Sequence, residues 1–307
     1  MAKTFMAHIH TEIENLRFCS IAPESDILIK SGDSDSYPGY FFENKLYSTD
    51  FFEILFFSEG AGQIWINDKE VVISDNSVVF ISPSQRHCYH LDMSRSKFHY
   101  LVFKEDMLLN FLEDKYFTYR LHYYYQTALT PVMEVDAATM QDFDYVLKMI
   151  ENESAFRHSD AEPVLGSLLC YLLSSLNRSY VDFYKITAKS SDNNIAFRFK
   201  GMLEKGMRGK QTVDSYAKKL GVSRVTLNSA VKAQFGLTAS QMIKNRLIVR
   251  IKNELVETNY SVAYISDKYG FSESNHLMRF FKAQTGRTIG QYLEDFARKL
   301  PPFHADC

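Results

Sequence analysis

The C-terminal third of the chain carries one local pattern twice, and this repeat constrains the fold more than any other feature. Residues 212–236 and 261–286 each read as a short helix, a glycine and a second helix. In each copy a Thr or Ser can cap the first helix, and a glycine can supply the positive-φ turn that follows it. The residues in these roles are Thr212, Ser261, Gly221 and Gly270. This layout is typical of a helix-turn-helix, so the sequence predicts two such units.

The second helix of each unit is expected to turn a polar face outward. In the first unit this face comprises Arg224, Val225, Asn228, Ser229 and Lys232. In the second unit it comprises Ser274, Asn275, Met278, Arg279 and Lys282, with His276 near its boundary. Asn and Arg side chains can read adenine and guanine edges, whereas Lys neutralises phosphates without reading sequence. An ordinary polar face is the alternative for one such helix, but two units of matching plan favour DNA binding.

A long connector separates the two units. Asn228 and Arg279 are interpreted as matching positions, 51 residues apart, and residues 239–257 between them are expected to form one helix. At about 1.5 Å per residue this helix extends about 28 Å, close to one DNA turn of roughly 34 Å. A connector of this length can place both second helices in successive major-groove segments of one duplex.

Charge is divided unevenly along the chain. Residues 195–300 hold 19 Lys and Arg against 8 Asp and Glu, a net charge of +11, whereas the remainder holds 16 against 29, a net charge of −13. A basic region of this size suits a polyanionic partner such as nucleic acid. A solvated basic surface without a partner is the alternative that charge alone leaves open.

The first part of the chain is rich in short strands. Between residues 37 and 105, apolar runs recur about every ten residues with turn residues between them, which favours an antiparallel sandwich or barrel. We assign residues 1–130 to this barrel, 131–184 to a helical connecting region, 185–194 to a polar linker and 195–300 to the helix-turn-helix domain.

One helix of the connecting region carries a leucine stripe. Leu165, Leu169, Leu172 and Leu176 follow a 4-3-4 spacing, which places them on one side of a helix. This stripe predicts either packing on the chain's own barrel or a homodimer seam, because a narrow stripe also suits a partner helix.

The basic region resembles the DNA-binding domain of the AraC/XylS family of bacterial transcription regulators. The resemblance rests on residues 216–223, 245–247 and 265–292. In the last of these segments the residues that fit are Gly270, Phe271, Arg279, Phe281, Lys282, Gly286 and Tyr292. It implies two helix-turn-helix units that bind promoter DNA, with base-facing side chains at Val225, Asn228, Ser229, Ser274, Asn275, His276 and Arg279.

The chain departs from the pattern of that family at several positions. Ala239 and Ile289 stand where the family usually has a proline after a threonine, and Leu277 stands where an aromatic residue is common. Ser229 replaces a residue that is frequently basic, which weakens the case for base reading by the first unit.

The strand-rich part is similar to the cupin-like sensor barrels that often precede this domain. Glu59, Gly60 and Gly62, with the segment from Ile81 to His87, carry the similarity. Together the two resemblances predict an α+β multidomain fold, with an N-terminal cupin-like β-barrel and following helices, and a C-terminal all-α domain with two helix-turn-helix units.

The barrel histidines do not match a cupin metal site. Such enzymes use a His-x-His pair with a downstream Glu, whereas His87 and His90 are separated by two residues and would point to opposite faces of a strand. His99 adds a third imidazole but no carboxylate, and a metal needs converging ligands. We therefore predict no metal, no cofactor and no catalytic residues.

A small-molecule effector site in the barrel is the preferred alternative, since small barrels can hold one small ligand. The residues expected to line it are Trp65, His87, Tyr89 and His99, with Glu53 behind them. An ordinary aromatic core is the competing interpretation of Trp65 and Tyr89.

The sequence thus predicts a cytoplasmic transcription regulator that binds double-stranded promoter DNA, responds to an effector and forms a homodimer, with RNA polymerase as a candidate further partner. No signal peptide is expected at the start of the chain, and the longest apolar run, near 164–176, is too short for a membrane span of roughly 20 residues. Two alternatives remain: a cupin-type enzyme with an accessory nucleic-acid-binding tail, and a DNA-binding protein whose barrel serves only dimerisation.

Overall fold

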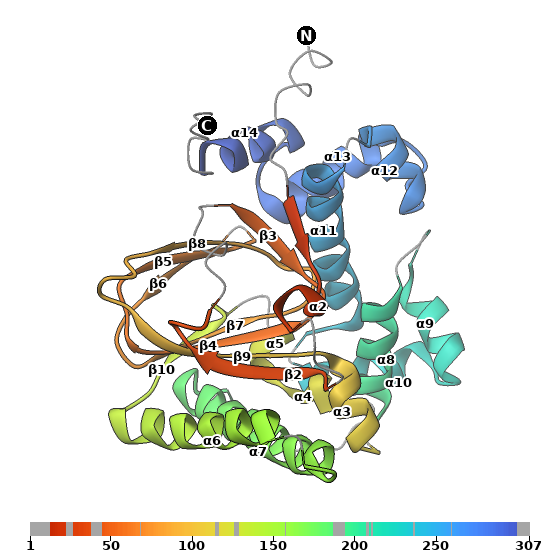
Figure 1. The fold of residues 1–307 in the computed structure, drawn as a ribbon. Helices are drawn as coiled ribbons and strands as arrows, with labels where there is room; N and C mark the ends of the chain where they lie inside the picture. Colours follow the sequence, from red (N-terminus) through yellow and green to blue (C-terminus); the bar gives the residue numbers. More distant parts are fainter. Residues whose placement is uncertain are drawn as a thin grey trace. The chain divides into compact units, whose positions relative to one another are not determined.

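The computed structural model describes residues 13–22, 27–37, 45–67, 69–113, 117–125, 129–156, 158–186, 194–206, 209, 211–235, 237–258 and 260–299. The described residues divide into two compact units, one within residues 13–186 and the other within residues 194–299 (Figure 1). The first unit contains all of the described strands, and the second consists of helices. Residues 187–193 of the predicted linker lie outside the described residues.

Two five-stranded sheets form the barrel of the first unit. One has the order β1 (Ile13–Leu16), β3 (Leu46–Thr49), β8 (Arg86–Leu91), β5 (Gly62–Ile66) and β6 (Lys69–Ile73). The other has the order β10 (Val132–Glu134), β7 (Ser77–Ile81), β4 (Phe52–Glu59), β9 (Lys97–Phe103) and β2 (Ile29–Asp33). The described strand pairs are antiparallel except β1 with β3. The predicted strand-rich barrel is therefore present.

Alternation along the strands separates two apolar clusters. On β4, Leu55 and Phe57 point into the barrel, where they meet side chains from both sheets. Phe52, Ile54 and Phe56 point the other way and pack against helices. Because successive side chains of a strand point to opposite faces, a residue's parity decides whether it reaches the interior. Glu53 has the same parity as Leu55 and therefore points into the interior.

Helices cover the outer face of the β4 sheet. The short ones are α3 (Glu105–Phe111), α4 (Phe117–Arg120) and α5 (His122–Tyr125), and the long ones are α6 (Ala137–Phe156) and α7 (Ala161–Phe183). The short helix α2 (Phe18–Ile21) instead packs with the interior cluster. The backbone N–H of Thr139 donates to Asp136 Oδ1 at 2.7 Å, so Asp136 caps α6. α6 and α7 share one core with the sheet, so they belong to the same compact unit as the barrel.

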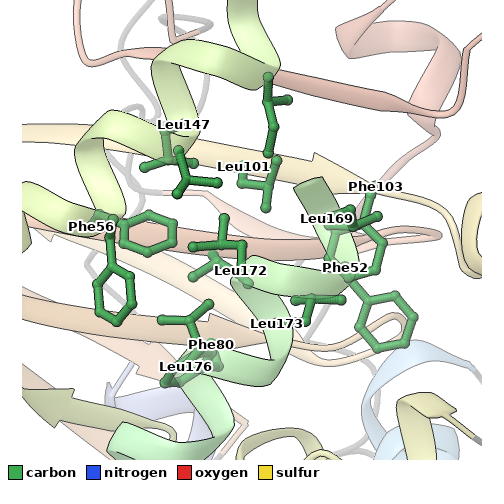
Figure 2. Packing of buried hydrophobic residues seen from close by; sticks show 14 of the residues in the cluster. Phe52, Phe56, Phe80, Leu101, Phe103, Leu147, Leu169, Leu172, Leu173 and Leu176 are labelled. Carbon is green, nitrogen blue, oxygen red and sulfur yellow. The ribbon is translucent and has the colours of Figure 1, made fainter. Parts of the chain in front are cut away.

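The leucine stripe of α7 faces the barrel and not a partner. Leu165, Leu169, Leu172 and Leu176 are each 0% exposed within the single chain. Figure 2 shows the last three beside Phe52, Phe80 and Leu101 of the sheet. The prediction of a dimer seam at these leucines is therefore wrong, because their surface is already buried against the chain's own strands.

The second unit is a bundle of seven described helices with one core. They are α8 (Asn194–Lys205), α9 (Val213–Leu220), α10 (Arg224–Phe235), α11 (Ala239–Glu257), α12 (Val262–Lys268), α13 (Ser274–Thr285) and α14 (Ile289–Lys299). α11 has the bounds that the sequence predicted. Buried residues of both repeats, such as Leu227 and Leu277, join Ile251 of α11 in a single cluster.

The turns of the repeat follow the predicted chemistry. Thr212 and Ser261 accept backbone N–H bonds three residues on, at 3.1 and 3.1 Å, and so cap α9 and α12. Gly221 and Gly270 have φ of 69° and 73°, which glycine adopts without the steric cost that a Cβ brings. The structure thus contains two helix-turn-helix units, α9–α10 and α12–α13.

Candidate functional site

The second helices of the two units, α10 and α13, are both 12 residues long and superpose in sequence with an offset of 50. Leu227 and Val231 are buried in one helix where Leu277 and Phe281 are buried in the other. The helix that follows begins with the same cap, because Thr238 bonds to Gln241 and Thr288 bonds to Gln291.

This register corrects the predicted correspondence of Asn228 with Arg279. Asn228 matches Met278, and Ser229 matches Arg279. The predicted offset of 51 residues between matching positions is wrong by one residue, because the buried positions of the two helices fix an offset of 50.

The outer face of α10 is poor in groups that donate to base edges. Val225 is 74% exposed, and Ser229 and Lys232 are also exposed. Arg224 lies at the start of the helix, where its guanidinium is 3.6 Å from the Asp214 carboxylate of α9. An apolar side chain such as Val225 can contact a thymine methyl group, and Lys232 can meet a phosphate.

Asn228 is half-buried and faces the next helix. Its Oδ1 accepts a hydrogen bond from the backbone N–H of Ala239, the first residue of α11, at 3.2 Å. The carboxamide oxygen is therefore engaged within the protein, and base reading by Asn228 stays a prediction.

The outer face of α13 holds a richer set of polar groups. Asn275, His276, Arg279 and Lys282 are exposed, and Ser274 is half-buried. The Ser272 hydroxyl lies 2.6 Å from His276 Nδ1, which fixes the orientation of the imidazole and leaves Nε2 outward. The geometry therefore places amide, imidazole and guanidinium groups on one exposed helix, whose Leu277 and Phe281 anchor it in the core.

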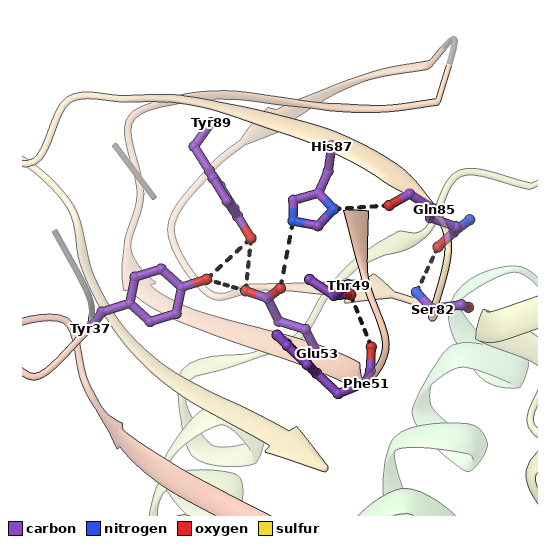
Figure 3. A network of polar contacts seen from close by, with 8 residues as sticks. All are labelled: Tyr37, Thr49, Phe51, Glu53, Ser82, Gln85, His87 and Tyr89. Carbon is purple, nitrogen blue, oxygen red and sulfur yellow. Dashed lines mark hydrogen bonds and ion pairs between the residues drawn. The ribbon is translucent and has the colours of Figure 1, made fainter. Parts of the chain in front are cut away.

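A second cluster of predicted residues lies inside the barrel (Figure 3). Glu53 of β4, with His87 and Tyr89 of β8, converge there and are fully buried. The Tyr89 hydroxyl donates to Glu53 Oε1 at 2.8 Å, and the Tyr37 hydroxyl donates to the same oxygen. His87 Nε2 lies 3.9 Å from Glu53 Oε2. Tyr37 is not among the predicted residues, because a chain with 19 tyrosines offers no reason to single out one of them.

Burial keeps this cluster electrically neutral. Burial raises the pKa of the Glu53 carboxyl to about 7, although the two tyrosine bonds favour the charged form. Burial lowers the pKa of the His87 imidazole to about 4. Desolvation also raises the pKa of Tyr37 and Tyr89 well above the ordinary value. A proton on Glu53 and a neutral His87 are thus the favoured states between about pH 4 and about pH 7.

Two buried atoms of the cluster make no hydrogen bond within the protein. They are Glu53 Oε2 and His87 Nε2. His87 Nδ1 lies 3.1 Å from the Gln85 carbonyl, so we assign the ring proton to Nδ1, and Nε2 then carries a lone pair. A buried polar atom without a partner is costly, so a ligand group that can donate a hydrogen bond would be favoured here.

Trp65 and His99 do not join this cluster. Trp65 has the opposite parity from Ile64 and Ile66, which point inward, so its side chain lies on the outer face of β5. His99 lies on the helix-facing side of β9, where Nδ1 is 2.5 Å from the Asp144 carboxylate of α6. The expectation that these two residues line the barrel interior is corrected by the strand parity.

Among the residues that the structure describes, no three His, Cys, Asp or Glu side chains gather as metal ligands would. Within the same ranges, no helix is both long and apolar enough to cross a membrane.

Comparison with known proteins identifies both halves of the chain. Residues 31–160 match the family described as the AraC-like ligand binding domain, and residues 216–295 match a family described as a helix-turn-helix domain. The transcriptional activator RhaS of Pectobacterium carotovorum is 22% identical over 233 residues, which cover 76% of this chain and 81% of RhaS. The transcriptional activator AggR of Escherichia coli is 23% identical over 150 residues, which cover 48% of this chain and 55% of AggR.

The solved structures that match this chain are remote in sequence. ToxT of Vibrio cholerae is 12% identical, with 87% of this chain and 98% of that chain covered and a TM-score of 0.39. The DNA-binding domain of AdpA, solved with a target DNA, is 23% identical, with 36% and 97% covered and a TM-score of 0.31.

The two matched domains and the curated relatives define a class: DNA-binding transcription regulators that join a ligand-binding domain to a helix-turn-helix domain. The chain belongs to the AraC/XylS family of these regulators.

Proposed function

We propose that the chain regulates transcription by binding promoter DNA with two unequal recognition helices, of which α13 supplies most of the base reading. The observation that carries this proposal is the exposed set Asn275, His276 and Arg279 on a helix anchored by Leu277 and Phe281. α10 contributes a methyl contact through Val225 and a phosphate contact through Lys232. The activator names of RhaS and AggR support a positive effect on transcription, and a contact with RNA polymerase stays a prediction.

Footprinting of the full chain on DNA upstream of neighbouring genes tests this proposal. We expect one protected region whose affinity falls steeply between 50 and 200 mM salt, by about a hundredfold or more if several phosphates are neutralised. A flat salt response or the absence of any protected region would contradict it.

We propose that the barrel interior is the effector site, centred on Glu53, His87 and Tyr89. Support comes from the two buried polar atoms without partners, His87 Nε2, which can accept a hydrogen bond, and Glu53 Oε2, which can donate one when the carboxyl is protonated. Both atoms are shielded from water, so the ligand must displace part of the Tyr37–Glu53–Tyr89 network on entry. A thermal-unfolding screen of metabolites, repeated with Glu53→Gln, tests the site. We expect a stabilising compound to lose its effect in the variant, and an undiminished shift would place the site elsewhere.

We further propose a homodimer in the cytoplasm that acts by binding and not by catalysis. DNA as a partner supports the cytoplasm, and the curated relatives are regulators. With the leucine stripe buried, the candidate seam moves to exposed apolar side chains of α6 and α7. These are Tyr145, Met149, Phe156, Val164, Tyr171 and Phe183.

Sedimentation of a variant with both Tyr145→Ser and Tyr171→Ser tests the seam. We expect a folded monomer, whereas Leu169→Asp should unfold the barrel unit because Leu169 is 0% exposed. A folded dimer of the double variant would place the seam elsewhere.

A further inference from the structure

The joint between α10 and α11 contains a hydrogen bond that the second helix-turn-helix unit, α12–α13, cannot make at its own joint with the next helix. Asn228 Oδ1, from the middle of α10, accepts from the N–H of Ala239, the first residue of α11. The first N–H groups of a helix have no partner within that helix, and Ala239 is 0% exposed, so water cannot serve as one. Asn228 thus satisfies a buried donor and ties two helices together.

Residue 239 is itself an unusual choice. The resemblance to the AraC/XylS family leads one to expect proline there, and proline has no N–H to donate. The bond exists because this chain has alanine at that position. At the matching position of the second unit, Met278 is 43% exposed and has no carboxamide. The Asn228–Ala239 hydrogen bond is therefore a feature of the first helix-turn-helix unit, α9–α10.

α11 is held along its length by other contacts. In its middle, Arg246 forms an ion pair with Glu204 of α8 at 2.6 Å, and Arg250 donates to the Glu204 carbonyl at 2.6 Å. Near its end, Glu254 pairs with Lys268 and accepts from the Tyr269 hydroxyl at 3.2 Å, both from the second unit. The second helix-turn-helix unit is thus fixed to the far end of α11, whereas α10 is held by the core that it shares with α8 and α9 and, at its joint with α11, by Asn228.

A small change at this joint has a large effect at the other end. The 19 residues of α11 span about 28 Å at about 1.5 Å per residue. A tilt of about 10° over that length displaces the far end by about 5 Å, which exceeds the roughly 3.4 Å between successive base pairs. The angle between α10 and α11 therefore decides how many base pairs separate the two contacted segments.

We propose that Asn228 is a positioning residue that fixes the spacing at which the two recognition helices engage DNA. It acts by holding α10 on the first turn of α11. This inference rests on the proposed function in one respect, that both helices engage the same duplex.

The test measures affinity for two duplexes. One is a duplex that the full chain selects from a pool of random duplexes. The other is the same duplex with one base pair inserted between the two protected segments. The native chain is expected to bind the lengthened duplex about tenfold or more weakly, as for a poorly matched site. The ratio of the two affinities, original duplex over lengthened duplex, is the quantity compared between variants. Asn228→Ala should reduce this ratio to about threefold or less, because α10 can then follow the displaced segment. Met278→Ala, at the matching position without the tie, should leave the ratio at the native value.

Two further variants separate the tie from a merely structural role. Asn228→Asp keeps the acceptor oxygen, so it should keep the native ratio although its charge lowers affinity for both duplexes alike. Ala239→Pro removes the donor at a helix position that tolerates proline. It should lower the ratio as Asn228→Ala does, and the double variant should lower it no further.

The outcomes are distinguishable. A ratio in Asn228→Ala and Ala239→Pro equal to the native ratio, in protein that shows native circular dichroism, would overturn the positioning role while leaving DNA binding intact. Equal affinity of the native chain for both duplexes would instead show that the two helices do not engage one duplex, which overturns the shared premise.

Discussion

The barrel and the helical unit place their functional polar groups in opposite environments. In the barrel, Glu53, His87 and Tyr89 are fully buried and held neutral. In the helical unit, Asn275 and Arg279 are exposed on a helix whose other face fills the core. A buried site gains selectivity from the cost of unmatched polar atoms, whereas a surface that reads DNA must leave its donors open to solvent. Substitutions should therefore change folding stability in the barrel and DNA recognition in the helical unit.

The largest expected effect concerns how the free energy of unfolding depends on pH. Glu53 and His87 contribute to this dependence with opposite signs, so their contributions largely cancel in the native chain. The raised pKa of Glu53 stabilises the fold at low pH, and this contribution is lost as pH rises through about 7. The lowered pKa of His87, about 4, stabilises the fold at higher pH, and this contribution is lost as pH falls toward 4. The two contributions oppose each other over nearly the same range.

Substituting one of the two residues should reveal the pH dependence that the other contributes. In Glu53→Gln, the free energy of unfolding should rise between pH 4 and 6.5 by at most about 3 kcal/mol. In His87→Gln, it should fall by a similar amount between pH 4.5 and 7. Trp65, the one tryptophan of the chain, lies in the barrel, so its fluorescence in urea reports this transition. Parallel pH profiles in the two variants would contradict the opposing pKa shifts.

The next largest effect concerns base reading by α13. Arg279→Ala should lose about 1–3 kcal/mol of discrimination at one base position, with the melting temperature unchanged because the side chain is exposed. Binding to duplexes that vary one base pair at a time measures this loss. Arg198→Ala removes an exposed arginine of α8 and serves as the control, with base preferences kept. Unchanged preferences in Arg279→Ala would remove this residue from the reading face.

A smaller effect is expected for a substitution in the barrel, which should change folding stability but not DNA recognition. Tyr89→Phe deletes one hydrogen bond to Glu53 Oε1 and should lower the free energy of unfolding by about 1 kcal/mol. Its base preferences should equal those of the native chain. Thermal unfolding and the same panel of duplexes measure both quantities, and an altered base preference would show that the two regions do not divide their roles in this way.

The smallest effect is expected at a phosphate contact. Lys282→Ala should weaken binding about equally on all sequences and reduce the slope of log affinity against log salt by about 1. Lys244→Ala, an exposed lysine of α11, should leave the slope as it is. Equal slopes in all three proteins would place Lys282 away from the backbone of the DNA.

The sequence predicted local patterns well and their registers less well. The bounds of α11 and the caps at Thr212 and Ser261 followed from short-range chemistry, which a single segment determines. The pairing of Asn228 with Arg279 was off by one residue, because only the buried positions Leu227 and Leu277 align the two helices.

Long-range placement was the main source of error. Glu53, His87 and Tyr89 meet in the interior, but Trp65 and His99 have the wrong strand parity, which depends on where each strand begins. The leucine stripe fits a barrel face and a partner helix equally well in sequence, and only the packing on Phe52 and Phe80 decides between them. The partnership of Tyr37 with Glu53 had no signal in the sequence at all.

The most direct measurement of the central claim is selection of random duplexes by the full chain, followed by sequencing. We expect two blocks of fixed base pairs about one helical turn apart, the better defined of which loses its preference in Arg279→Ala. Retained duplexes that share no base pairs, or a single block that is unaffected by Arg279→Ala, would contradict recognition by two unequal helices.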